Sequence, residues 1–246
     1  MKTQSATCKP ASCQPLHAGQ ASRVLRLAMV CALSVPLAAI VTAGSAEAAT
    51  AAGSAVPAMT TCIACHGAKG EGNSAAGYPR LAGLPADYIA AQLHSFAQGT
   101  RANSLMAPMA KALSDGQIIA LAHYYSSLKP PVAAYGPMPA AAQAELGQRL
   151  AERGDWAAGI ASCFRCHGPG GVGVAPSFPP LIGQSAGYIE AQIKAWKDGS
   201  RRNDPQGLMH TIALRLTDAD TQAVAAWLAA QKPPASTPRH ASAQRH

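Results

Sequence analysis

Charged and aromatic side chains are scarce in this 246-residue chain, at 13% and 5% of its residues. No segment alternates apolar and polar residues for long enough to suggest a β-sheet, so the pattern predicts helices. Runs of lysine or arginine are absent as well. The net charge of +8 is therefore weak support for a nucleic-acid or membrane partner, and we expect no nucleic acid to bind.

Cysteine is absent outside the N-terminal segment and two short motifs. The seven cysteines stand at positions 8, 13, 31, 62, 65, 163 and 166. Arg23 and Arg26 precede an apolar run at residues 27–43, and residues 46–48 have the small-x-small form of a signal peptidase site. A run of about 17 residues is the lower limit for a membrane helix, but the cleavage motif favours removal. We therefore predict a signal peptide at residues 1–48, exported by the general secretory route because the two arginines are not adjacent.

Removal of that segment leaves four cysteines, and all four belong to CxxCH motifs at residues 62–66 and 163–167. Two thiols at this spacing can add across the vinyl groups of a haem, and the following histidine then reaches the iron. A zinc site or a redox dithiol also uses paired cysteines at this spacing. Duplication in an exported chain favours haem, and no cysteine remains for a structural disulfide. We predict two covalently attached haem c groups, held by Cys62, Cys65, Cys163 and Cys166, with His66 and His167 on the irons.

The sequence around the first motif repeats around the second. Pro79-Arg80-Leu81-Ala82-Gly83 corresponds to Pro179-Pro180-Leu181-Ile182-Gly183, and Tyr88-Ile89 corresponds to Tyr188-Ile189. Each copy ends in Lys-Pro-Pro. Self-similarity of this kind indicates two copies of one fold. We predict a first domain at 49–129, a proline-rich linker at 130–141, a second domain at 142–234 and a disordered tail at 235–246.

Each copy is expected to be helical. Apolar residues recur at helical spacing in residues 87–98 and 188–198, and a further helix is expected at about 142–153. Ser114 with Gln117 forms a capping-box pattern, and Thr217 with Asp220 forms a related one.

The repeat also indicates the second axial ligand of each iron. Met106 and Met209 both stand eight positions before a capping residue. Met109 corresponds to Ile212, which cannot bind iron, so we expect Met109 to pack in the haem pocket. His210 is the rival ligand in the second copy, but Ala107 occupies the matching position in the first.

Two prolines are expected to orient the axial histidines. Pro79 and Pro179 open the Pro-x-Leu-x-Gly segments, and we expect their carbonyl groups to accept the second ring proton of His66 and His167. Arg101 and Arg201 recur at matching positions. Either a solvent-exposed role or pairing with haem propionates would explain them.

Across residues 55–231, these motifs resemble dihaem cytochromes c of the cytochrome c4 family, which are built from two class I cytochrome c domains. The resemblance rests on the CxxCH pairs, the Pro-x-Leu-x-Gly segments, the Tyr-Ile helices and the Met106 and Met209 positions. It implies an all-α fold with two tandem domains and electron transfer in the periplasm, often with membrane respiratory complexes. Departures from the family pattern, such as the long signal, do not touch a ligand.

Two functions suit this ligand set, because histidine and methionine fill both axial positions and leave no open iron for substrate. The first is a one-electron carrier between respiratory donors and a terminal oxidase or reductase, in the periplasm and either in solution or associated with the membrane. The alternative is the dihaem electron-transfer subunit of a periplasmic dehydrogenase that oxidises sulfide, an alcohol or thiosulfate. In neither case is the chain itself an enzyme. A dihaem peroxidase would need a displaceable ligand, which the two methionines argue against.

Overall fold

The computed structural model describes residues 59–130, 136–204 and 206–232. The predicted signal peptide and the predicted tail lie outside these ranges. Within them the regular structure is helical, apart from isolated bridges such as Asn73 with Tyr78, and the prediction of an all-α fold is confirmed. No helix among these residues is long and apolar enough to cross a membrane.

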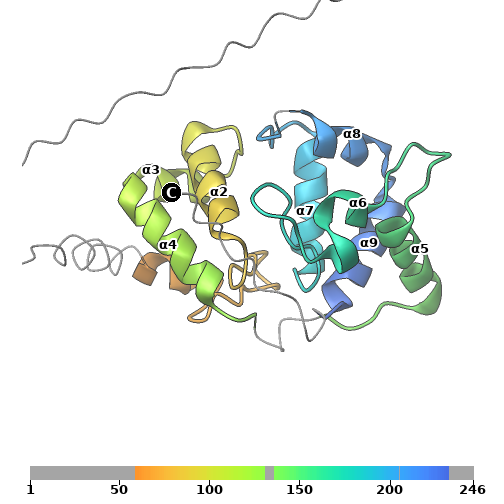
Figure 1. Cartoon of the computed structure of the whole chain (residues 1–246), viewed down its shortest axis with the longest axis horizontal. Coiled ribbons are helices and arrows are strands. Elements are labelled where there is room, and N and C mark those ends of the chain that lie inside the picture. The colour runs from red at the N-terminus through yellow and green to blue at the C-terminus, as the bar shows by residue number, and fades with distance from the viewer. Residues whose placement is uncertain (1–58, 131–135, 205, 233–246) are drawn as a thin grey trace, which may run out of the picture. The chain divides into compact units, whose positions relative to one another are not determined.

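The first half of the described chain, residues 59–130, packs two long helices against each other (Figure 1). Residues 59–66 are helical, followed by α2 (Ala86–Gln98), α3 (Met106–Lys111) and α4 (Asp115–Ser127). Gly99 ends α2 in the left-handed region at φ 76°, where glycine lacks the Cβ that would clash. The predicted capping box of Ser114 and Gln117 begins α4. The buried apolar cluster contains Leu84, Tyr88, Ile89, Leu121, Ala122 and Tyr125.

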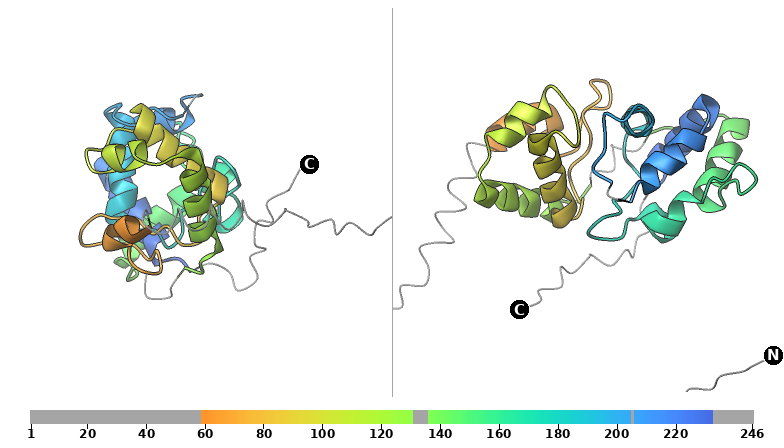
Figure 2. Two further views of the ribbon diagram at one scale, coloured as in Figure 1. Left: turned by 90° about the vertical axis from the view of Figure 1, so that its left-hand side faces the viewer. Right: turned by 90° about the horizontal axis from the view of Figure 1, so that it is seen from above.

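The second half, residues 136–232, places helix α5 ahead of its motif (Figures 1 and 2). Its helices are α5 (Ala141–Glu152), α6 (Cys163–His167), the 3₁₀ turn η2 (Pro169–Gly171), α7 (Ala186–Lys197), α8 (Leu208–Arg215) and α9 (Asp218–Ala230). Helix α5 starts one residue before the predicted bound, and α7 starts two residues before it. The predicted capping box of Thr217 and Asp220 begins α9.

Helices α5 and α9 approach closely because Gly147 has no side chain. A Cβ at Gly147 would lie 2.3 Å from the carbonyl oxygen of Ala223 and 2.6 Å from the Cβ of Trp227. Leu150 on α5 and Val224 and Leu228 on α9 are each 2% exposed or less, and they centre the apolar core of this half. This packing holds α5 beside α6, the helix that contains the second CxxCH motif.

Arg101 and Arg201 form an antiparallel bridge between the two halves. Their side chains are 6% and 7% exposed, so the solvent-exposed role considered for them is wrong. Each guanidinium stacks on an aromatic ring of its own half, 4.5 Å from the centroid of Phe96 or Trp196. Each also donates to oxygens of the opposite half: Arg101 to Tyr188 and Gln192, and Arg201 to Tyr88 and Gln92.

Candidate functional site

Each motif histidine is oriented by the carbonyl group of a proline from the Pro-x-Leu-x-Gly segment. Nδ1 of His66 lies 2.9 Å from the oxygen of Pro79, and Nδ1 of His167 lies 2.8 Å from the oxygen of Pro179. A ring nitrogen that donates to a carbonyl leaves the other nitrogen, Nε2, with its lone pair available. The same contact therefore prepares both imidazoles to bind a metal through Nε2.

Burial favours the neutral form of both imidazoles. His66 is 6% exposed and His167 is 7% exposed. Burial lowers the pKa of His66 below its ordinary value, against the opposing effect of the Pro79 carbonyl. Burial also lowers the pKa of His167, and the nearby charge of Arg201 adds to the effect. A neutral imidazole is the form that binds metals.

No disulfide joins any of the four motif cysteines, which all lie in the described part of the chain. Cys62 packs against the apolar cluster of the first half, and Cys163 packs against that of the second. Burial raises the pKa of the Cys163 thiol to about 11, and burial likewise raises the pKa of Cys62. Cys166, in contrast, is exposed. The first cysteine of each motif thus reaches inward, as attachment to a buried prosthetic group requires.

The two candidate methionine ligands are placed by different capping residues. Met106 begins α3, and the Asn103 side-chain oxygen accepts its N–H at 2.8 Å. Met209 is the second residue of α8, and the Asp204 carboxylate accepts its N–H at 2.6 Å. The sequence reasoning missed both capping roles. Asn103 recurs as Asn203, but the structure gives the capping role in the second half to Asp204.

Met109 and His210, the other two residues considered for the haem sites, have different surroundings from Met106 and Met209. Met109 is 45% exposed and lies outside the apolar cluster of the first half. Nδ1 of His210 lies 2.7 Å from the carbonyl oxygen of Trp196. This contact ties the His210 ring to α7, whereas Met209 packs against the apolar cluster of the second half.

A covalent haem fits these residues better than the alternatives do. Among the described residues, no group of three or more His, Cys, Asp or Glu side chains could hold a metal ion, so the zinc reading lacks a ligand set there. The buried Tyr125 hydroxyl lies beside the Cys62 side chain. Cys62, Cys65 and His66 would hold one haem, and Cys163, Cys166 and His167 the other.

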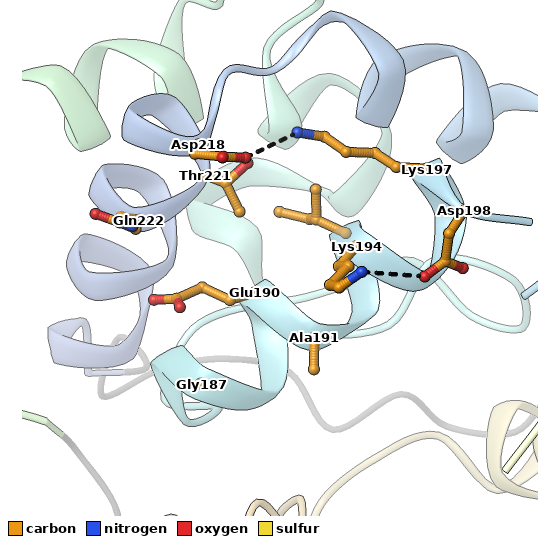
Figure 3. A pocket seen from close by; sticks show the side chains of 10 residues that line it. Gly187, Glu190, Ala191, Lys194, Lys197, Asp198, Asp218, Thr221 and Gln222 are labelled. Atoms are coloured by element: carbon orange, nitrogen blue, oxygen red, sulfur yellow. Dashed lines mark hydrogen bonds and ion pairs between the residues drawn. The ribbon is translucent and has the colours of Figure 1, made fainter. Parts of the chain in front are cut away.

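A separate surface groove lies between α7 and α9, with a volume of about 540 Å³ (Figure 3). Four of its charged side chains form two ion pairs: Lys194 with Asp198 at 3.5 Å and Lys197 with Asp218 at 3.6 Å. No cysteine, histidine or methionine lines it. The groove is therefore not part of either candidate haem site.

Comparison with known proteins agrees with this geometry. The family model described as cytochrome c matches residues 50–129 and 144–232. The chain is 64% identical to a thiosulfate dehydrogenase electron acceptor of Thiomonas intermedia over 190 residues, which cover 77% of this chain and 86% of the relative.

Two solved structures are similar in fold and sequence. The thiosulfate dehydrogenase of Marichromatium purpuratum matches with a TM-score of 0.64 and 43% identity, covering 68% of this chain but only 36% of that one. Reduced cytochrome c4 from Pseudomonas stutzeri matches with a TM-score of 0.66 and 30% identity, covering 76% of this chain and 100% of that one. Cytochrome c domains bind haem c covalently, and this chain has two of them. The chain therefore belongs to the cytochrome c family, as a dihaem electron-transfer protein of the cytochrome c4 type.

Proposed function

We propose that this protein accepts electrons from a thiosulfate-oxidising dehydrogenase in the periplasm and passes them on one at a time. The observation that supports this most directly is the 64% identity to an electron acceptor of thiosulfate dehydrogenase over 86% of that relative's length. The catalytic centre would belong to the partner chain. Of the two functions considered from the sequence, this is the dehydrogenase-linked one.

Within this proposal, iron is bound in the first domain by His66 and Met106 and in the second by His167 and Met209. The histidines are supported by the Pro79 and Pro179 carbonyl contacts, and the methionines by the capped helix starts at α3 and α8. The domain bounds are 49–129 and 142–234, joined by the linker at 130–141. The signal peptide at 1–48 is removed after general secretion.

A free carrier that serves membrane respiratory complexes is the second candidate. The similarity to cytochrome c4 of Thiocapsa roseopersicina, at 39% identity over 85% of that relative, favours it. The two candidates share the same haem chemistry. They differ in whether the electron donor is a dedicated dehydrogenase.

Reduction by a defined donor separates them. The oxidised holoprotein is mixed with thiosulfate and the thiosulfate dehydrogenase of Thiomonas intermedia, and haem reduction is followed by absorbance. We expect reduction that requires both components and outpaces that of Pseudomonas stutzeri cytochrome c4 under the same conditions. Equal rates for the two cytochromes would contradict a dedicated partnership and favour the free carrier.

A further inference from the structure

Trp156 is the most exposed large apolar side chain among the described residues, with 68% of its surface open to solvent. The other two tryptophans of the chain, Trp196 and Trp227, are 5% and 7% exposed. An indole carries about 150–250 Å² of surface that burial would remove from water. Single exposed apolar residues are ordinary, so the surroundings of Trp156 decide whether its exposure has a function.

The backbone around Trp156 is held rigidly in a tight turn, residues 155–160. Asp155 and Ile160 exchange two backbone hydrogen bonds, at 2.8 and 2.7 Å, and the Gly159 N–H donates to the Trp156 carbonyl at 3.1 Å. The Asp155 carboxylate accepts the Ala158 N–H and pairs with Arg149, both at 3.2 Å. The turn thus presents the indole outward on a preorganised backbone, and binding there would lose little backbone freedom.

This turn is adjacent to two elements of the second half, α6 and α8. Its chain continues directly into α6, where Arg165 stands exposed between Cys163 and Cys166. On the other side, Arg215 of α8 packs on the turn, since a Cβ at Gly159 would lie 2.8 Å from its Nε. Helix α8 also carries Met209. Trp156, Arg165, Leu214 and Arg215, all exposed, are called the tryptophan surface below.

The first half of the chain does not repeat this combination. Trp156 stands seven positions before Cys163, and the residue seven positions before Cys62 in the first copy is Ala55. Inside the motif, Ala64 stands where Arg165 stands. Two positions before the capping residue, Ala112 stands where Arg215 stands. An exposed tryptophan on a turn that an arginine packs against is thus encoded in the second copy alone.

We propose that the tryptophan surface is the docking site for the electron-donating dehydrogenase, which would present carboxylates around an apolar patch. This rests on the proposed function. Tryptophan and arginine are the side chains that most often dominate binding energy at interfaces, and the two arginines call for an acidic partner surface. The partner loses one electron and the second half of this chain gains it, and no group is transferred.

Two variants of the complete holoprotein test the proposal. The measurement is the second-order rate constant of reduction by thiosulfate-reduced dehydrogenase from Thiomonas intermedia, at several salt concentrations. Trp156→Ala should lower it about tenfold, as loss of an interface anchor does. Arg215→Gln should lower it a few-fold at low salt and weaken its salt dependence. Ile119→Ala, which removes a 54% exposed side chain from α4 in the first half, is the matched control and should change nothing.

Reduction by ascorbate, a small reductant that needs no docking surface, should proceed at the same rate in all variants. Wild-type rates with the dehydrogenase in both Trp156→Ala and Arg215→Gln would overturn the docking site while leaving the proposed function intact. An equal slowing of ascorbate reduction in Trp156→Ala would also overturn it. If ascorbate reduces the wild-type protein but the dehydrogenase does not, the proposed function is refuted, and the docking site with it. A dimer by sedimentation that Trp156→Ala converts to monomer would assign the surface to a second copy instead.

Discussion

Replacing Asp204 with alanine should loosen Met209, the proposed axial ligand of the second haem, and leave the first site unchanged. The Asp204 carboxylate accepts three backbone N–H groups at the start of α8: those of Leu208 at 3.0 Å, Met209 at 2.6 Å and His210 at 3.3 Å. These donors have no partner within the helix, since they belong to its first turn. The variant leaves them without the carboxylate and frees the segment that positions Met209.

The size of the effect follows from two contributions of one side chain. Removing a capping side chain costs about 0.5–2 kcal/mol, and a negative charge at a helix N-terminus stabilises it by about 0.3–1 kcal/mol. Because both act through the same carboxylate they overlap, and we expect a loss of about 1–2 kcal/mol. A change of about 1.4 kcal/mol is tenfold in an equilibrium constant, so displacement of Met209 by an external ligand should become about 5- to 30-fold more favourable.

The assay is a titration of the ferric holoprotein with imidazole, followed by the near-infrared band of methionine-ligated haem. The shifted methionine methyl resonances of the reduced protein distinguish the two irons by NMR. Asp198→Ala is the control for lost charge, since that carboxylate pairs with Lys194 on the surface and caps no methionine. Asn103→Ala should weaken only the first site, and by less, because its cap is neutral. The reasoning fails if Asp204→Ala changes the second site no more than Asp198→Ala does, or changes the first site instead.

Three further outcomes are expected. Met106→Ala should open the first iron to carbon monoxide while the second stays closed, and Met109→Ala should open neither; the reverse pattern in carbon monoxide difference spectra would show that the repeat alignment is wrong. Gln92→Ala should lower the free energy of unfolding by about 1–3 kcal/mol, because buried donors from both arginines lose their acceptor; an unchanged urea midpoint would argue against this. The pKa of the Asp155 carboxyl lies below its usual value, chiefly because the carboxylate accepts the Ala158 N–H and also because it pairs with Arg149. The ionised Asp155 carboxylate therefore stabilises the turn fully above about pH 4, and this stabilisation is lost as the pH falls through the lowered pKa. Amide exchange in the turn, corrected for its intrinsic rate, should accelerate below that pH in the wild type and show no such step in Asp155→Asn.

Helices α2, α4, α5, α7 and α9 were accessible from the sequence because their signals are local, whereas α3, α6 and α8 were not predicted. The capping residues Ser114 and Thr217 form the predicted boxes at the starts of α4 and α9. The all-α class follows from the same short-range patterns, and the two covalent haems follow from five-residue motifs. The assignment of Met106 and Met209 as iron ligands came from the repeat and stays a prediction.

The two copies use one recurring residue differently, and no pattern in the sequence indicates this. Asn103 caps α3, but Asn203 donates to Gln92 and Ser95 in the other half. Asp204 takes over the capping role because the loop before α8 is longer than the loop before α3. A sequence alignment records that an asparagine recurs, and it cannot record which partner lies within reach.

The sequence by itself determined the two covalent haems, the duplication and the starts of α4 and α9, because these follow from short motifs and from their recurrence along the chain. The particular haem-attachment residues stay a prediction. Tertiary structure decided the burial of Arg101 and Arg201, their exchange of partners between the halves and the outward presentation of Trp156. These features depend on which surfaces come together after the helices form. Packing across distant segments sets the environment of each charge and ring, and no local pattern in the chain encodes that environment.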